Sequence, residues 1–236
     1  MFNLNGKVAM VTGASGNLGL AVTAALLKAG AHGALIDRAT KRLAEMHSVP
    51  GANLLLLEGV DLADPAAAER AVEATVKKFG RVDILINTVG GFAGGLPLHQ
   101  EALTIWEKMF QINLHTTVNA CRAVIPAMLQ QGSGRIVNVA ARAGLSGVPT
   151  LGAYSASKSA VIRLTESLAG EYRDQGITVN CVLPGTIDTP QNRQDMPTAD
   201  HRKWVAPSAI ADAIVFLVSD AARAVSGAAL PVYGRS

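Results

Sequence analysis

Tyr154 and Lys158 stand four residues apart, a spacing that could support proton transfer. If this segment is helical, both side chains project from one face, with Cβ atoms roughly 6 Å apart. A nearby ammonium stabilises a phenolate, so we expect Lys158 to lower the pKa of Tyr154 from about 10 toward neutral pH. A tyrosine adjusted in this way can give a proton to a substrate or remove one. Because the same spacing is common on solvated helices, its meaning depends on the rest of the chain.

A glycine-rich turn at residues 12–19 is the second candidate site. It follows the apolar run 8–11, which is typical of a buried strand, and precedes the run 20–27, which is typical of a helix. Glycine lets the backbone approach a pyrophosphate, and a helix N-terminus offers free N–H groups at the positive end of its dipole. The order of strand, turn and helix therefore predicts a dinucleotide site. The alternative is that these glycines serve only the close packing of a helix on a sheet.

The composition favours one α/β domain over residues 1–236. Hydrophobic residues make up 49% of the chain and charged residues 17%, enough apolar material for a large core. The net charge of +3 comes from scattered residues, so we expect no nucleic-acid partner. Cys121 and Cys181 lie far apart and the histidines are scattered, which predicts reduced thiols and no metal site.

The N-terminus does not resemble a signal peptide, and the longest aliphatic run, 54–57, is too short for a bilayer. We therefore expect a cytoplasmic protein without a membrane partner.

Apolar, strand-like runs alternate with helical patterns throughout the chain. The expected strands are 7–12, 32–37, 53–60, 82–87, 134–140, 177–183 and 228–233. The expected helices lie near 18–29, 39–47, 65–79, 101–112, 114–131, 152–174 and 207–219. This alternation predicts a single Rossmann-type, doubly wound parallel sheet of about seven strands with helices on both faces. The long irregular stretch 184–206 has the length of a binding segment, and we expect it to be the substrate loop.

Ligands of such sheets bind beyond the carboxyl ends of the strands. The polar candidates of this chain follow its predicted strands: the glycine turn, Asp37, Asp61, the segment 87–90, Ala140 with Ala141, and Pro184 with Gly185. The sequence therefore predicts one site along one edge of the sheet.

Taken in order, these segments resemble the short-chain dehydrogenase/reductase superfamily over essentially the whole chain. The residues that carry the resemblance are 12–19, Asp61, 87–90, Asn113, Tyr154, Lys158, Pro184, Gly185 and Thr189. The resemblance implies that Tyr154 and Lys158 are catalytic and that Asn113 keeps a water in the proton path. It implies an NAD(P) site made of Gly13, Ser15, Gly16, Asn17, Leu18, Gly19, Asp37, Arg38, Asp61, Leu62, Asn87, Thr88, Gly90, Tyr154, Lys158, Pro184, Gly185, Ile187 and Thr189.

Four of these residues have a plainer interpretation. Asn113 could cap a helix junction, Asn87 could satisfy backbone groups at a strand end, and Asp61 could be a turn residue. For Asp37, an acidic residue after the second strand would accept hydrogen bonds from ribose hydroxyls, which favours NAD(H). The neighbouring Arg38 could accommodate a 2′-phosphate, so NADP(H) is the alternative. Asp37 could also simply cap a helix beginning near Ala39.

The sequence departs from the family pattern in three places. Asn17 stands where the turn usually has a glycine, but asparagine tolerates left-handed backbone, so we expect the turn to survive. Thr88 and Val89 replace an Asn-Ala pair. The main departure is Ala141, 13 residues before Tyr154, where the family has a serine that hydrogen-bonds the reacting oxygen. Losing such a donor typically costs about 2.7–4 kcal/mol of transition-state stabilisation. Polar residues of the same loop that could replace it are Arg142, which could also be merely solvated, Ser146 and Thr150.

Two stretches are similar to dihydropteridine reductase, a branch of the superfamily that lacks this serine. They are residues 90–95 and, in the expected substrate loop, Leu183 with Pro184 followed by residues 188–200. The resemblance implies a pterin-like substrate, in which a conjugated imine accepts hydride and a proton and an oxyanion donor matters less. A different class of function, a catalytically weak or inactive cofactor-binding or scaffold protein, is the alternative.

The apolar helices 114–131 and 152–174 either pair across a two-fold in a homodimer or homotetramer, as the family resemblance implies, or are simply core helices.

Overall fold

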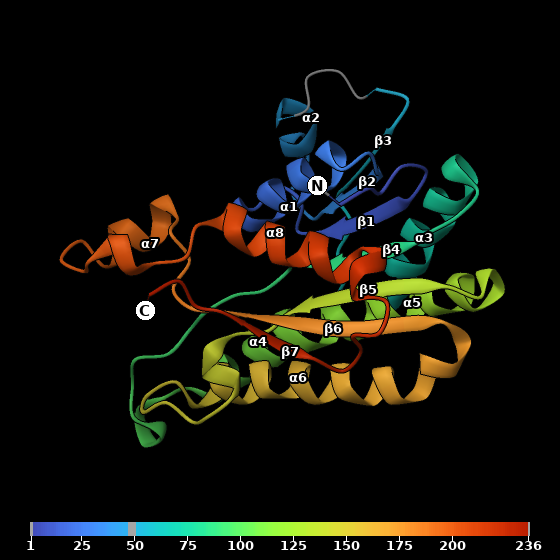
Figure 1. Ribbon diagram of the computed structural model, residues 1–236. Helices are drawn as coiled ribbons and strands as arrows, with labels where there is room; N and C mark the ends of the chain where they lie inside the picture. Colours follow the sequence, from blue (N-terminus) through green and yellow to red (C-terminus); the bar gives the residue numbers. More distant parts are fainter. Residues whose placement is uncertain (1, 47–50, 236) are drawn as a thin grey trace.

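The computed structural model describes residues 2–46 and 51–235, and its centre is one parallel sheet of seven strands (Figure 1). The strand order is β3-β2-β1-β4-β5-β6-β7. The strands are β1 (Val8–Thr12), β2 (His32–Asp37), β3 (Leu54–Glu58), β4 (Ile84–Asn87), β5 (Gly134–Val139), β6 (Ile177–Pro184) and β7 (Ala229–Val232). This arrangement confirms the predicted doubly wound α/β fold.

Helices cover both faces of the sheet. They are α1 (Asn17–Lys28), α2 (Arg42–Met46), α3 (Pro65–Phe79), α4 (Leu103–Phe110), α5 (Thr116–Gln131), α6 (Gly152–Tyr172), α7 (Pro190–Asp195) and α8 (Pro207–Val218). One core cluster joins α1 and α8 to the sheet, and a second joins α3, α5 and α6 to its other face. Within the described ranges, no helix has the length and apolarity needed to cross a bilayer.

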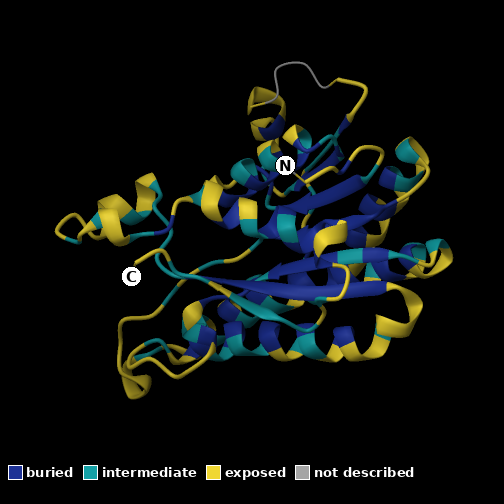
Figure 2. Ribbon diagram, viewed as in Figure 1, coloured by how far each residue is buried: buried dark blue, intermediate teal, exposed yellow. Residues whose placement is uncertain are grey.

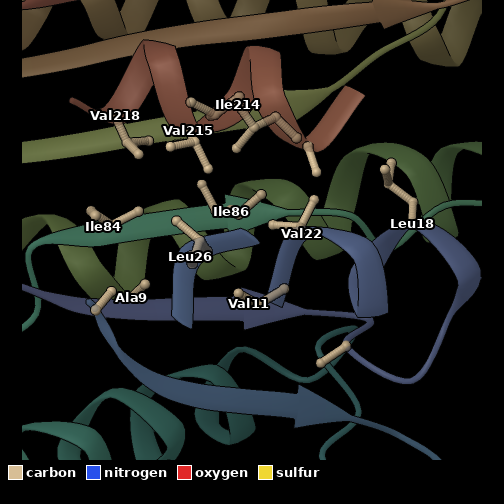
Figure 3. Close-up of a cluster of buried hydrophobic side chains, with 14 of the residues drawn as sticks. Ala9, Val11, Leu18, Val22, Leu26, Ile84, Ile86, Ile214, Val215 and Val218 are labelled. Carbon is tan, nitrogen blue, oxygen red and sulfur yellow. The ribbon is translucent and has the colours of Figure 1, made fainter. Parts of the chain in front are cut away.

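The apolar runs explain why the sheet lies inside the molecule. Every residue of β1, β4 and β6 is buried, which suits strands covered on both faces (Figure 2). On one face, Val22 and Leu26 of α1 and Ile214 and Val218 of α8 point toward the sheet (Figure 3). Burying such a side chain contributes roughly 1.5–3 kcal/mol each, so this packing fixes the position of α1 beneath the glycine turn.

The strand order reverses between β1 and β4, where the sheet has its switch point. Thr12 of β1 lies beside Ile36 of β2 on one side and Asn87 of β4 on the other. Because the strands are parallel, their carboxyl ends lie together. The glycine turn, Asp37 and the segment after Asn87 therefore meet at one edge.

Four predicted elements differ from the structure. The predicted helices 101–112 and 114–131 form one helical stretch, in which α4 and α5 are joined by a π-helical turn at Gln111–His115. The predicted helix 39–47 is shortened to α2, and residue 47 lies outside the described part of the chain. The predicted irregular stretch 184–206 contains α7, which projects from the sheet near the C-terminus (Figure 1).

Candidate active site

The glycine turn is shaped for close approach to a ligand. Gly13 has φ +63°, in the left-handed region that favours glycine, and a Cβ at Gly19 would overlap the Gly13 carbonyl. Side chains at these positions would therefore distort the turn. No side chain caps the start of α1, so its first-turn N–H groups keep their capacity for an acceptor.

Asn17 corrects one expectation about this turn. It is the first residue of α1 and has no positive φ, so the tolerance of asparagine for left-handed backbone is not needed. Leu18 is buried in the core on the same helix, so its side chain anchors the turn and any ligand contact would come from its backbone.

Asp37 joins the end of β2 to the glycine turn. Its carboxylate accepts hydrogen bonds from the Ser15 hydroxyl at 2.7 Å, from the Ser15 N–H at 3.0 Å and from the Ala39 N–H at 2.9 Å. Burial opposes ionisation of Asp37, but these hydrogen bonds and the nearby Arg42 outweigh it and hold its pKa below the ordinary value. Because α2 begins at Arg42, Asp37 is not the cap of that helix. Asp37 is thus an ionised acceptor beside the turn, while Arg38 is exposed.

Asn87 lies inside the protein rather than on an open surface. Its side chain is 2% exposed and donates to Asn138 Oδ1 at 2.9 Å, and Asn138 in turn donates to Thr165 Oγ1 at 3.0 Å. The alternative that Asn87 satisfies backbone groups at a strand end is therefore not what its amide nitrogen does, because this atom bonds the side chain of Asn138. Thr88 similarly donates its hydroxyl to the carbonyl of Thr12, at 2.6 Å.

Asn113 brings the π-helical turn into the site. Its Oδ1 accepts from the Gly91 N–H at 2.9 Å, and its Nδ2 donates to the Gly91 carbonyl at 3.2 Å and to Ser157 Oγ at 3.0 Å. Ser157 Oγ donates to the carbonyl of Tyr154 at 2.8 Å. The side chain leaves its own helix, so Asn113 does not cap a helix junction. Instead it ties the segment after β4 to the helix that carries Tyr154.

Lys158 and Tyr154 lie on α6, but the expected effect of one on the other is absent from the structure. Lys158 is 5% exposed and its ammonium donates to the carbonyl of Val139, at 2.9 Å. Burial lowers the pKa of Lys158 to about 8 and raises the pKa of Tyr154 to about 12. The prediction that Lys158 lowers the pKa of Tyr154 is therefore wrong for this arrangement, because burial dominates both groups and the ammonium is directed to β5.

The residues around this pair converge closely. A Cβ at Gly90 would lie 3.1 Å from both Asn113 Oδ1 and Lys158 Nζ, so glycine leaves a small space between the two side chains. A Cβ at Gly144 would meet the Lys158 backbone at 2.8 Å, which shows that the segment after β5 packs on α6. Ala141, at the start of that segment, is buried.

Within the described residues, the three polar candidates to replace a serine at position 141 have other partners or face solvent. The Arg142 guanidinium lies over the Tyr233 ring, 5.1 Å from its centroid. The Thr150 hydroxyl donates to the Pro149 carbonyl at 2.6 Å, and Ser146 is exposed.

The remaining predicted cofactor residues lie at the same edge, mostly with local partners. Asp61 accepts from the Ala63 N–H at 3.0 Å, so its turn role is present in the structure, and the neighbouring Leu62 is buried. Thr189 caps α7 through the Asn192 N–H at 3.1 Å. Pro184 ends β6, with Gly185 and Ile187 after it, and Ile187 forms a parallel bridge with Val205.

Several residues that build the site were not predicted from the sequence. Ser157 could have been found, because it stands one turn after Tyr154 on the same face. Val139 contributes only a carbonyl, which no side-chain pattern reveals. Phe92 also went unassigned: its ring lies edge-on to the Tyr154 ring, with centroids 5.0 Å apart and planes at 70°.

The geometry fits a nicotinamide dinucleotide. The turn at Gly13 and the uncapped start of α1 suit a pyrophosphate, and the ionised Asp37 beside Ser15 suits ribose hydroxyls. Gly90 packs closely against Lys158 and Asn113 at the same edge.

Comparison with known proteins agrees with this geometry. A family model described as short chain dehydrogenase matches residues 7–200. The 2-(R)-hydroxypropyl-CoM dehydrogenase of Xanthobacter autotrophicus is 37% identical over 97% of each chain. A crystal structure of NAD+-bound xylitol dehydrogenase has a TM-score of 0.89 at 28% identity and 98% coverage of both chains. The structure of ElxO with NADP bound has a TM-score of 0.90 at 28% identity and covers 97% of each chain.

Proposed function

Since the chain belongs to the short-chain dehydrogenase/reductase family of oxidoreductases, we propose that it is a reductase in which Tyr154 gives a proton to a carbonyl or imine substrate. The observation that carries this proposal is that Gly90 lies against Asn113 and Lys158, and that Asn113 is tied through Ser157 to the backbone of Tyr154, at the carboxyl edge of the sheet. Separate elements hold these groups in place, as catalysis by positioned side chains requires.

Burial determines the protonation state of Tyr154. With its pKa raised to about 12, the Tyr154 phenol is protonated at neutral pH and can donate its proton to a substrate. Removing a proton from an alcohol would first require the phenolate, which this burial disfavours. The protonated phenol therefore supports the reduction proposed here.

The cofactor proposed for this site is NAD(H), with NADP(H) as the alternative. A bound dihydronicotinamide would supply the hydride. The ionised Asp37 would accept ribose hydroxyls and repel a 2′-phosphate, which supports NAD(H). Arg38, Lys41 and Arg42 follow it in the sequence, and these cations would favour the phosphate instead. Asp61 and Thr189 are proposed to contact the cofactor with the polar atoms that their turn and cap leave free.

The substrate proposed here needs no second hydrogen-bond donor. Ala141 has no polar side chain, and Arg142 and Thr150 are engaged with Tyr233 and Pro149. A simple ketone would develop negative charge on oxygen without a partner at this position. An imine that is part of a conjugated ring, as in a pterin-like molecule, spreads that charge and needs mainly the Tyr154 proton. The segment 184–206, including α7, would form part of its binding site.

A catalytically weak cofactor-binding protein is the second candidate function, and Ala141 is the observation that favours it. A protein that only bound the cofactor would not need all three of Tyr154, Lys158 and Asn113. The retention of this geometry supports the enzyme.

A homodimer or homotetramer is proposed from the outer face of α5 and α6. A hollow of about 340 Å³ lies between these helices, lined largely by apolar side chains such as Ile125, Leu129, Leu164 and Leu168. Leu129 is exposed there, which supports burial against a second copy. The two cysteines are free and buried, in keeping with a cytoplasmic location.

Oxidation of NADH and NADPH should be followed spectrophotometrically against quinonoid dihydropterin, a cyclic imine, a quinone and a simple ketone. We expect turnover of at least one conjugated substrate, and slower turnover of the ketone. Tight cofactor binding by calorimetry without turnover of any substrate would instead support the cofactor-binding protein.

A further inference from the structure

Phe92 is a large apolar side chain placed against the catalytic tyrosine and open to solvent. It is 65% exposed, yet its ring lies edge-on to the Tyr154 ring at a centroid distance of 5.0 Å. Most of this apolar surface therefore remains uncovered beside the proton donor. An exposed phenylalanine in isolation needs no explanation, but one in contact with the reacting group does.

The backbone on both sides of Phe92 is fixed. On one side, Asn113 holds the N–H and the carbonyl of Gly91. On the other, the Gly95 N–H donates to the Thr150 carbonyl at 2.8 Å. Phe92 thus lies one residue after one anchored position and three residues before the other, which restricts the movement of its backbone.

Thr150 adds a second sign that this loop contact matters. Its φ is +64°, a conformation that is strained for a β-branched residue and costs of order 1–3 kcal/mol. A Cβ at Gly94 would approach the Thr150 carbonyl to 2.8 Å, so the two loops lie against each other at this point. The strained residue Thr150 lies where the loop that carries Phe92 contacts the loop after β5. The two loops therefore form one continuous surface.

Other exposed apolar residues come from the same two segments. Leu96 lies after Phe92, and Leu145 and Val148 lie between Ala141 and Thr150. Among the apolar side chains of these segments, Phe92 is the one whose ring contacts the Tyr154 ring. These apolar side chains fit a ring more closely than a polyol or a charged chain. They offer no hydrogen-bond partners to the hydroxyl groups of a polar substrate.

We propose that Phe92 is the specificity-determining residue of this enzyme and that it packs against a planar, conjugated ring bearing the reacting carbonyl or imine. The proposal rests on the function proposed above. A bound dihydronicotinamide would supply the hydride to the ring carbon, Tyr154 would give its proton to the oxygen or nitrogen, and the double bond between these two atoms would become single. Phe92 takes no part in this transfer. It holds the plane of the ring beside the tyrosine, and aromatic pairs of this kind contribute about 0.5–1.5 kcal/mol beyond area burial.

The test compares Phe92→Ala, Phe92→Trp and the unaltered protein on two probes, 9,10-phenanthrenequinone as a planar ring and 2,3-butanedione as a small aliphatic dicarbonyl. For Phe92→Ala we expect KM for the quinone to rise about tenfold with kcat nearly unchanged, and both constants for butanedione to change less than about twofold. Phe92→Trp should keep the low KM for the quinone. Leu103→Ala is the matched control, because Leu103 is also exposed, at 77%, and should leave both probes unaffected. Equal effects of Phe92→Ala on the two probes would overturn the proposal.

A binding measurement separates this proposal from the proposed reductase activity. The affinity of 2-naphthol, a planar ring that cannot be reduced here, is measured by calorimetry with saturating cofactor. We expect Phe92→Ala to weaken it about tenfold, and this result would support the ring site even if no probe were turned over. Unchanged affinity in Phe92→Ala, with its thermal unfolding intact, would show that Phe92 does not contact the ring.

Discussion

The ammonium of Lys158 donates a hydrogen bond of 2.9 Å to the carbonyl oxygen of Val139, the last residue of β5. This bond fixes α6 against the edge of the sheet where the other site residues gather. It also directs the ammonium away from the role expected from sequence, as an immediate partner of Tyr154. Because burial lowers the pKa of Lys158 to about 8, its charge changes within the pH range of ordinary assays.

Stability should therefore depend on pH through Lys158. Above about pH 10.5 the amine is neutral in both states, and below that the unfolded chain takes up a proton while the folded protein does not until about pH 8. Stability is thus lost as the pH falls through this window, by an amount on the order of 3 kcal/mol. Urea unfolding of Lys158→Met should show a smaller change than the unaltered protein between pH 7 and pH 10. The variant also leaves the Val139 carbonyl unpaired, but that cost does not vary with pH, so identical slopes would contradict the burial effect.

Tyr154→Phe should reduce turnover of the best substrate by about 10²-fold or more, because the phenol is the proposed proton donor. Cofactor binding, followed by fluorescence, should stay within a few fold. Tyr172→Phe, at the far end of the same helix, is the control and should retain activity. If Tyr154→Phe turns over at a near-normal rate, the proton comes from another group.

NADH should bind at least about tenfold more tightly than NADPH, a difference of about 1.4 kcal/mol. The ionised Asp37 is the reason, since it accepts hydrogen bonds and repels a phosphate. Asp37→Asn keeps most of the side chain's shape and should reduce the difference in affinity between NADH and NADPH, as measured by calorimetry with both cofactors. Tighter binding of NADPH by the unaltered protein would assign the preference to the basic residues Arg38, Lys41 and Arg42.

Ala141→Ser should separate two classes of substrate. The new hydroxyl restores a donor near a developing oxyanion, so reduction of a simple ketone should improve, by less than the roughly 10²–10³-fold lost when such donors are removed. The gain is limited because the surrounding side chains were not arranged around a serine. A conjugated imine should gain little. Steady-state kinetics on both substrates tests this difference. An equal increase in kcat/KM for the ketone and the imine would identify a weakened ketone reductase.

The sheet and its functional edge were predictable because they depend on patterns that the sequence carries directly. Apolar runs such as 8–11 mark strands, and parallel strands bring their carboxyl ends together, so Asp37 and the glycine turn were expected to meet. The helix α7 could also have been predicted, because Thr189 and Pro190 form the same start, a capping residue followed by proline, as Asp64 and Pro65.

The parts that were not predicted depend on three-dimensional packing. The π-helical turn around Asn113 places one extra residue in a helix, and no periodicity in the sequence indicates it. The pKa values of Tyr154 and Lys158 follow from burial, which spacing on a helix does not report. Asn87 was expected near a ribose, but its amide instead serves the buried pair with Asn138, since β4 and β5 lie in register at these residues.

The strand order also has a consequence for how the protein acquires its site during folding. Thr12 and Asn87 are neighbours across β1 and β4 although they are 75 residues apart in the chain, and Asn87 and Asn138 are joined across a further 51. Contacts between such distant segments form late and slowly, because long loops must close before they contribute stability. Helices α1 and α3 are local and can form early. In refolding experiments, helical circular dichroism should therefore recover before cofactor binding does, and a nascent chain that ends before α6 should have a partly formed sheet but no competent site.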